Sequence, residues 1–190
     1  MPSQKGEIAA GTSAYVALLR GINVGGKNML PMKDLAAIFS KARCTAVETY
    51  IQSGNVVFRA DPKVAAGIPA VITKAISARS KMSIPVVVRS AAELRRVVKN
   101  NSFVQRGMDV DKLHVAFLAG APTAAAVAAL DAKRSPPDEF VVRGAEIYLH
   151  CPNGYGRTKL SNAYFDSKLD TVSTVRNWRT VLKLLELSGG

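Results

Sequence analysis

One stretch of the sequence, residues 18–30, has the residue types of an anion-binding site. It reads Leu-Leu-Arg-Gly-Ile-Asn-Val-Gly-Gly-Lys-Asn-Met-Leu, so three glycines stand among two cations and two carboxamides. Glycine N–H groups can contact the oxygens of a phosphate or carboxylate, cations can neutralise its charge, and carboxamides can orient it. The predicted ligand-binding residues of this stretch are Arg20, Asn23, Gly25, Gly26, Lys27 and Asn28.

Residues 21–28 nearly match the nucleotide-binding pattern GxxxxGK[ST], but Asn28 stands where the pattern requires a hydroxyl for magnesium. The next helix is expected to begin at Pro31, too late for Lys27 to lie in its first turn. The second strand also lacks a metal-holding Asp at its end. We therefore expect anion binding without nucleoside triphosphatase chemistry. A tight turn with positive backbone angles explains the glycines equally well, and only the clustered cations and carboxamides favour binding.

A second glycine-containing segment, residues 152–159, has a similar composition. It carries Arg157 and Lys159 beside a helix expected to start at Thr158, where N–H groups and the helix dipole favour negative charge. The first and third strands of the unit are expected to be parallel neighbours, so that the loops after them leave the same edge of the sheet. Arg157 and Lys159 are therefore further candidate ligand contacts.

Arg176 and Asn177 are candidate ligand contacts at the start of the last helix, which is expected over residues 176–187. Thr174 is the expected N-cap of this helix. Trp178 is expected to anchor it in the core.

Groups that could carry out a reaction are sparse, so the catalytic residues are unknown. His114 falls within a predicted strand, where a lone histidine more often packs than reacts. An imidazole beside Cys151 could lower the pKa of that thiol, but His150 and Cys151 are strand neighbours and should point to opposite faces. The carboxylates form no evident acid–base pair, and common hydrolase motifs are absent. The sequence indicates no metal site and leaves any cofactor unknown.

The composition favours a soluble protein that meets anionic partners. The chain has 190 residues, 48% of them hydrophobic, and a net charge of +12, which suits phosphates, nucleic acids or acidic partners. Its apolar runs are too short to cross a bilayer, and we expect no membrane association. Two cysteines without CxxC spacing favour a reducing cytoplasm. The oligomeric state is unknown.

The first half alternates strand and helix patterns. Strands are expected at residues 15–20, 47–52, 55–59 and 85–89, and the middle two form a hairpin around Ser53-Gly54. Helices are expected at 31–42 and from Asp61 onward, the second one either kinked or starting near Pro69. Ser90 and Glu93 form a capping box for a connecting helix at 91–99, followed by a loop at 100–111.

The second half repeats this order. Strands are expected at 113–119, 140–142 and 146–150, helices at 122–132 and 158–169, and a short extended piece at 171–173. The fold class is therefore α+β, with two tandem ferredoxin-like (βαββαβ) units joined by a helix, plus a C-terminal helix. The expected domains are a flexible tail at 1–13, a first unit at 14–90, a connection at 91–111 and a second unit at 112–190. The halves share an order of elements without an evident residue-by-residue repeat.

Four motifs of the chain resemble the bacterial domain-of-unknown-function 1697 family. They are the stretch at 18–28, Thr-Tyr-Ile-Gln-Ser-Gly-Asn-Val-Val-Phe at 49–58, Gly-Arg-Thr-Lys-Leu at 156–160 and Thr-Val-Arg-Asn-Trp at 174–178. The resemblance implies two ferredoxin-like α/β units and carries over no established catalytic residue. Family members often have Asn-Pro-Phe where this chain reads Asn101-Ser102-Phe103, which puts the conformation of that loop in question.

Taken together, these patterns predict a cytoplasmic protein that binds a phosphate- or carboxylate-bearing ligand through the stretch at 18–30. One alternative is a nucleic-acid-binding protein that uses its basic surface, although the stacking aromatics of an RNA-binding sheet are missing. A second alternative is an enzyme that acts on a phosphorylated small molecule.

Overall fold

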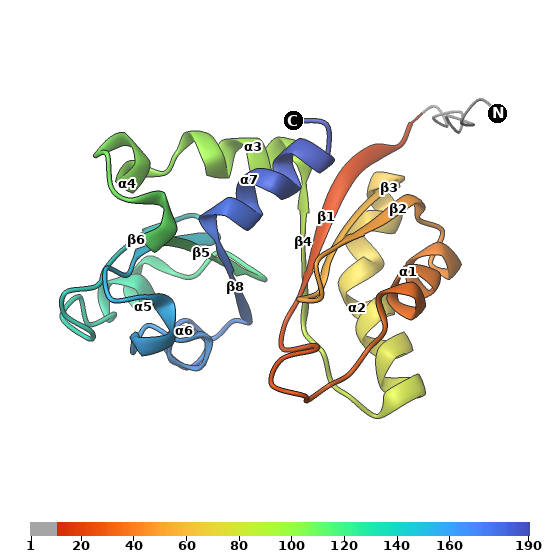
Figure 1. The fold of residues 1–190 in the computed structure, drawn as a ribbon, viewed down its shortest axis with the longest axis horizontal. Helices are drawn as coiled ribbons and strands as arrows, with labels where there is room; N and C mark the ends of the chain where they lie inside the picture. The colour runs from red at the N-terminus through yellow and green to blue at the C-terminus, as the bar shows by residue number, and fades with distance from the viewer. Residues whose placement is uncertain (1–10) are drawn as a thin grey trace. The chain divides into compact units, whose positions relative to one another are not determined.

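The structure is a computed structural model that describes residues 11–190 (Figure 1). Residues 1–10 of the expected tail lie outside the described residues, and Ser13, its last residue, already belongs to the first strand. The fold is mixed α+β, with two four-stranded antiparallel sheets. Each sheet belongs to a compact unit of its own. The first unit runs to Ala91 and includes Leu187–Gly190, and the second comprises Ala92–Glu186.

The first unit follows the predicted order of elements. Its strands and helices are β1 (Ser13–Leu19), α1 (Met32–Lys41), β2 (Thr45–Tyr50), β3 (Asn55–Ala60), α2 (Pro62–Ser80) and β4 (Val86–Ser90). The sheet has the order β2-β3-β1-β4. Helix α2 begins at Pro62, because Asp61 accepts a hydrogen bond from the N–H of Lys63 at 2.8 Å, and it runs through Pro69 without a second start.

The expectation that the first and third strands are parallel was wrong. Strands β1 and β3 pair antiparallel, with Ala17 opposite Val56. The physical reason is the hairpin, which reverses the chain between β2 and β3, so the crossover through α1 makes β1 parallel to β2 instead. The loops after β1 and β3 therefore leave opposite ends of the sheet, and the same holds in the second unit for β5 and β7.

The core of the first unit forms between α1, α2 and one face of its sheet. Helix α1 buries Leu35, Ile38 and Phe39, which the 3.6-residue period places on one stripe. Helix α2 adds four buried residues, and the sheet contributes residues that alternate along β1 and β3. The buried partners are Ala65, Ile68, Ile72 and Ile76 from α2 and Ala17, Leu19, Val56 and Phe58 from the sheet. Burial of this stripe is what fixes α1 against the sheet.

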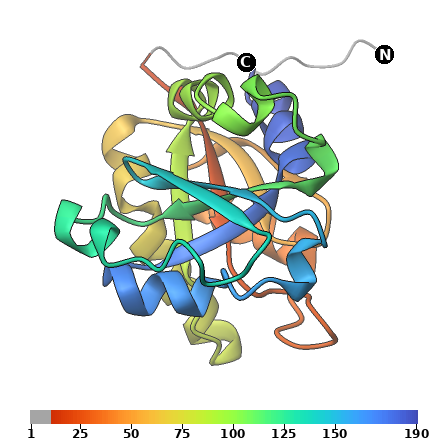
Figure 2. The same ribbon diagram turned by 90° about the vertical axis from the view of Figure 1, so that its left-hand side faces the viewer.

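The second unit contains β5 (Leu113–Leu118), α5 (Ala124–Ala128), β6 (Glu139–Arg143), β7 (Glu146–His150), α6 (Asn162–Leu169) and β8 (Ser173–Asn177), in the sheet order β6-β7-β5-β8. Before them come α3 (Ala91–Lys99), whose first residue still belongs to the first unit, and α4 (Ser102–Gln105), and after them α7 (Trp178–Leu187). Helix α6 packs on one face of the sheet through Tyr164, Phe165 and Leu169 (Figure 2). The segment predicted as a loop at 100–111 contains α4 and a 3₁₀ turn at Val110–Lys112.

The two sheets have equivalent registers at their centres. Val16 of β1 lies opposite Arg89, and Val115 of β5 lies opposite Arg176. The hydrogen bonds that extend the ladders also correspond: Leu19 N–H donates to Gly54 O at 2.8 Å, and Leu118 N–H donates to Ala145 O at 2.9 Å. When the two units are aligned by these registers, Tyr-Val-Ala-Leu-Leu at 15–19 corresponds to His-Val-Ala-Phe-Leu at 114–118. The sequence patterns alone did not reveal this correspondence.

The segment at Asn101-Ser102-Phe103 is the first turn of α4. The Asn101 side chain accepts a hydrogen bond from Phe103 N–H at 3.0 Å, so Asn101 is the N-cap and Ser102 is the first helical residue. Proline is favoured at that position, and Asn101 already has the extended conformation (φ −74°, ψ 101°) that a residue before proline adopts.

We expect Ser102→Pro to stabilise the protein by about 0.4–1 kcal/mol, because it restricts the unfolded chain at a site that already suits proline. Thermal unfolding should show a midpoint about 1–4 °C higher for a chain of this length. A lower midpoint would mean that the Ser102 N–H or side chain has a role that the helix start does not explain.

Candidate functional site

The Gly-rich loop, residues 20–31, connects β1 to α1 in the first unit (Figure 1). At its tip Gly25 and Gly26 have φ values of 57° and 73°, and Lys27 N–H donates to Val24 O at 3.0 Å. Positive φ at both central residues of a two-residue turn is the conformation that most requires glycine. The loop is therefore a short hairpin, which explains why both glycines are present.

The base of this hairpin is held by carboxamides. The Asn23 side chain donates to Leu30 O at 2.9 Å and to Gln52 O at 3.0 Å, and it accepts from Leu30 N–H at 2.7 Å. Asn28 donates to Gly21 O at 2.9 Å. The sequence suggested that these carboxamides orient a ligand, but in the structure they are bonded to the loop's own backbone and to the neighbouring β2–β3 turn. Ligand contacts from this loop would therefore come from its other polar groups.

The surface of the loop is basic and partly apolar. Lys27 is exposed, and so are Val24 (61%), Met29 (66%) and Ile51 (50%) of the adjoining β2–β3 turn. Residues 12–91 contain eleven Lys and Arg against three Asp and Glu, a net charge of +8. Most of the positive charge of the chain thus lies in the part that carries the Gly-rich loop, which favours the approach of anions.

The geometry of the loop differs from that of a nucleotide-binding P-loop. Helix α1 begins at Met32, so Lys27 lies outside its first turn, as the sequence predicted. The residue before the helix, Pro31, makes no side-chain capping bond. The dipole of α1 therefore does not contribute to anion binding at the loop tip.

The second candidate segment, residues 152–159, does not lead directly into a helix as predicted. Arg157 ends a 3₁₀ turn, and α6 starts only at Asn162, with the Ser161 hydroxyl accepting from Tyr164 N–H at 3.3 Å. Thr158 has an extended backbone (φ −72°, ψ 147°), and although its hydroxyl accepts from Leu160 N–H at 3.1 Å, no helix follows it before the cap at Ser161. The predicted helix start beside Arg157 and Lys159 was wrong, and no helix dipole supports an anion there. This segment belongs to the second unit and is a separate candidate.

The predicted start of the last helix was also wrong. Thr174, Arg176 and Asn177 belong to β8, and α7 begins at Trp178, capped by Asn177, whose side chain accepts from Thr180 N–H at 2.8 Å. Arg176 is only 8% exposed, and its guanidinium donates to Thr174 Oγ1 at 2.8 Å and Val175 O at 2.9 Å. Burial lowers the pKa of Arg176 to about 10. Asn177 therefore caps a helix, and Arg176 is a buried part of the sheet.

The reactive side chains of the second unit are in environments that suppress their chemistry. Burial raises the pKa of Cys151 to about 11, with a further upward contribution from Asp138. His150 Nδ1 lies 3.6 Å from Glu139 Oε1, and its ring contacts Phe103. His114 stacks on Tyr155 with ring centroids 4.9 Å apart, and burial lowers its pKa. None of these contacts activates the thiol as a nucleophile.

We expect both cysteines to react slowly in the folded protein. The pKa of buried Cys44 is also raised to about 11, so at pH 8 each thiolate fraction is about a hundredfold lower than for a thiol of pKa 9.0. Labelling with an aromatic disulfide reagent at pH 8 should be at least a hundredfold slower in native protein than in urea. Rapid labelling of one native thiol would contradict this and would revive a nucleophilic role.

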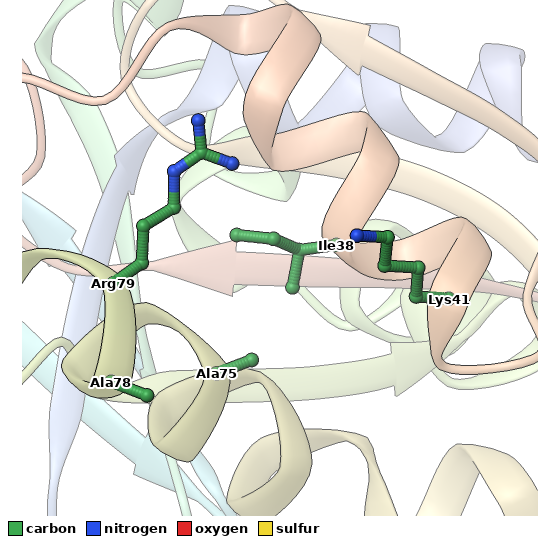
Figure 3. A pocket seen from close by; sticks show the side chains of 5 residues that line it. All are labelled: Ile38, Lys41, Ala75, Ala78 and Arg79. Carbon is green, nitrogen blue, oxygen red and sulfur yellow. The ribbon is translucent and has the colours of Figure 1, made fainter.

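A pocket of about 330 Å³ lies between α1 and α2, lined by Ile38, Lys41, Ala75, Ala78 and Arg79 (Figure 3). The sequence analysis did not single it out. The signal that was available is the pair Ala75 and Ala78, three residues apart, near the end of a helix that buries Ile68, Ile72 and Ile76. Small residues on a face that meets another helix leave space unless a large side chain fills it.

No helix in residues 11–190 is both long and apolar enough to span a bilayer. Within the same part of the chain, His, Cys, Asp and Glu side chains do not gather in threes as they would around a metal ion.

Comparisons with known proteins agree with the described fold. A family model described as "Protein of unknown function (DUF1697)" matches residues 12–148. The structure is similar to that of the conserved bacterial protein SP0830 from Streptococcus pneumoniae, with a TM-score of 0.68 at 22% identity, over 93% of this chain and 99% of that chain. At this identity the likeness concerns the fold. No curated protein matches the sequence significantly.

Proposed function

Because the chain belongs to the DUF1697 family of proteins of unknown function, whose description assigns no activity, we propose a function from its own Gly-rich loop. The protein binds a small phosphate- or carboxylate-bearing ligand at the loop tip, where Lys27 supplies charge and Gly25 and Gly26 supply N–H groups. Arg20, whose N–H donates to Pro85 O at 3.0 Å at the start of the loop, is a further cation of the site. The observation that carries this proposal is the pair of adjacent glycines at positive φ beside exposed Lys27.

The turn leaves the glycine amides accessible to a ligand. Its internal hydrogen bond uses the N–H of Lys27, which donates to Val24 O, and not those of the two central residues. A side chain built at Gly25 or Gly26 would meet no atom within 4 Å, so the space outside the turn is open. An anion can therefore approach both amides closely, which side chains at these positions would hinder.

The rigid base of the loop reduces the cost of binding. Asn23 joins the loop to Leu30 and Gln52, and Ile22 and Leu30 are buried in the core. A loop that is already ordered loses little conformational freedom when a ligand binds. This supports a role for the carboxamides in preparing the site, while the cations and glycines contact the ligand.

The proposal is tested by calorimetric titration with inorganic phosphate, acetate and a nucleoside monophosphate. Lys27→Ala should weaken binding of at least one of them about tenfold or more, since hydrogen bonds to charged groups contribute about 1.5–3 kcal/mol. Lys33→Ala, which removes an exposed cation from the first turn of α1, is the matched control. Equal affinities for wild type and Lys27→Ala would refute the loop as an anion site.

Arg157 and Lys159 are proposed only as a second, independent contact for anions. Lys159 N–H donates to Ser135 Oγ at 3.0 Å, which fixes the backbone of that segment. Arg157→Ala in the same titrations decides whether this segment contributes. An unchanged affinity removes it from the proposal and leaves the Gly-rich loop untouched.

Nucleic-acid binding is the alternative that the charge distribution favours. The net charge of +8 over residues 12–91, with exposed Val24, Met29 and Ile51 near Lys27, would suit a strand contacted through its backbone and by apolar side chains. A fluorescent single strand whose affinity falls steeply with salt would support this reading. Release of phosphate from a phosphorylated small molecule, lost in Lys27→Ala, would instead support an enzyme.

The proposal also covers the duplication of the fold and the cellular compartment of the protein. The strand orders β2-β3-β1-β4 and β6-β7-β5-β8, with antiparallel neighbours, support duplicated ferredoxin-like units. The cysteines Cys44 and Cys151 are free and buried, which supports a reducing compartment such as the cytoplasm.

A further inference from the structure

The pocket between α1 and α2 combines an apolar wall with cationic ends. Ile38 of α1 faces Ala75 and Ala78 of α2, while Lys41 of α1 and Arg79 of α2 lie on opposite sides of Ile38 (Figure 3). Its volume of about 330 Å³ is at the lower end of the range for small-molecule sites, which is about 300–1,000 Å³. The shape therefore suits a small ligand with one apolar part.

The charges around the pocket are unequal. Arg79 Nη2 donates to Asp34 Oδ2 at 2.7 Å, so this cation already has a carboxylate partner. Among the described residues, Lys41 has no carboxylate within salt-bridge distance. The pocket thus has one cation in excess, and a ligand with a single negative charge would balance it.

The positions of Lys41 and Arg79 at helix ends explain why cations occur there, but they do not explain the pocket. Lys41 is the last residue of α1 and Arg79 is next to last in α2, where positive charge offsets the partial negative charge of the free carbonyls. That effect requires no hollow and no apolar wall. The space exists because the side chains of α2 opposite Ile38 are the small ones of Ala75 and Ala78.

We propose that this pocket binds a small amphipathic organic anion, a carboxylate that carries a short aliphatic chain. The carboxylate contacts Lys41 and the outer edge of the Arg79 guanidinium, and the chain covers Ile38, Ala75 and Ala78. The site is distinct from the Gly-rich loop: Lys41 lies nine residues beyond Met32, about 14 Å along α1 at 1.5 Å per residue. It goes beyond the proposed function because its ligand is recognised largely by apolar contact.

The experiment is a titration of isotopically labelled full-length protein with hexanoate, followed by amide chemical shifts. The shifts should gather on α1 and α2 around Ile38, Ala75 and Ala78. Lys41→Gln should weaken hexanoate binding about fivefold, the size expected when an exposed charge pair is lost. Ala78→Leu should also weaken binding, because leucine takes up part of the pocket beside Ile38 while keeping good helix propensity at an exposed position.

Lys33→Gln is the matched control, since it removes a lysine from the same helix outside the pocket. The neutral probe hexanol should bind more weakly than hexanoate and should not respond to Lys41→Gln. The proposal is overturned if no hexanoate shifts occur around Ile38, Ala75 and Ala78, or if Lys41→Gln and Lys33→Gln bind hexanoate there with equal affinity. Hexanoate shifts at Gly25, Gly26 and Lys27 would report the Gly-rich loop and should be lost in Lys27→Ala. The shifts on α1 and α2 should persist in that variant, so failure of this pocket and failure of the Gly-rich loop are distinguishable.

Discussion

Replacing Gly54 by alanine should destabilise the protein by about 2–5 kcal/mol, the largest effect that we expect from a single methyl group. Gly54 ends the β2–β3 turn with a φ of 77°, a conformation that residues other than glycine rarely adopt. A Cβ atom there would lie 2.8 Å from Leu19 Cβ and 3.0 Å from the Ile22 side chain. The substitution therefore adds backbone strain and a steric clash together.

The clash cannot be relieved by a rotamer change. Leu19 Cβ is fixed by the backbone of β1, and Leu19 N–H itself donates to Gly54 O at 2.8 Å. Leu19 and Ile22 are fully buried, so neither side chain can move toward solvent. Relief would require β1 and the turn to separate, which breaks this hydrogen bond and loosens the start of the Gly-rich loop.

Thermal unfolding of Gly54→Ala should give a midpoint at least about 5 °C below that of the wild type. Gly21→Ala is the matched control: its φ is 73°, but a Cβ there meets nothing within 4 Å. It should cost only the backbone strain of about 1 kcal/mol or slightly more. Equal losses for both variants would show that the close approach to Leu19 has no energetic consequence.

Removing the side chain of Asn23 should give the second-largest effect, a loss of about 2–4 kcal/mol. Its carboxamide makes three hydrogen bonds to backbone groups of Leu30 and Gln52, and Leu30 is only 3% exposed. Without Asn23, the N–H and C=O of Leu30 lose partners in a site with restricted access to water. The φ of Asn23 is 54°, so Asn23→Gly removes the hydrogen bonds without adding backbone strain.

Asn28→Gly is the comparison that isolates the role of Asn23. Asn28 has a similar φ of 50°, but its side chain donates only to Gly21 O, at an exposed position, and loss of this bond should cost about 1 kcal/mol or less. Chemical denaturation of both variants provides the free energies of unfolding. If Asn28→Gly were the more damaging substitution, the loop would not be held at its base by Asn23. On the proposed function, Asn23→Gly should also weaken phosphate binding.

The order of strands and helices could be predicted because each element has a local signal. Leu35, Ile38 and Phe39 recur with a helical period, and Asp61-Pro62 marks a helix start that the structure confirms. The strands of the β6–β7 hairpin were placed to within a residue around Arg143-Gly144. These signals depend on neighbours in the chain, so no knowledge of the tertiary fold was needed.

The errors concern choices that only tertiary pairing decides. Thr174 and Asn177 are both good caps, and the residues between them fit a helix or a strand. Pairing of Val175 with Ala116 in β5 selects the strand and leaves Asn177 as the cap of α7. The start of α6 was misplaced for a similar reason, because Thr158 and Ser161 both can cap and buried Leu160 favours the later one.

The carboxamides of the Gly-rich loop illustrate the same limit for the candidate site. Their types and spacing suit a ligand as well as a backbone, and nothing in the sequence places Gln52 or Leu30 within reach of Asn23. The pocket between α1 and α2 was missed because its walls come from residues more than thirty positions apart. Local patterns identify polar clusters along the chain, but not hollows between elements.

Because the two sheets have equivalent registers, the loops that follow their first strands can be compared in length. In the second unit five residues, 119–123, join β5 to α5, whereas the equivalent step from β1 to α1 takes twelve, residues 20–31. Joining strand to helix thus requires far fewer residues than the first unit uses. The additional segment brings its own anchors, Ile22 and Leu30 in the core and Asn23 at the base, and all of its residues from Val24 to Met29 are exposed. The tip at Val24–Lys27 is accordingly where a library of grafted loops could be displayed with least disturbance to the frame.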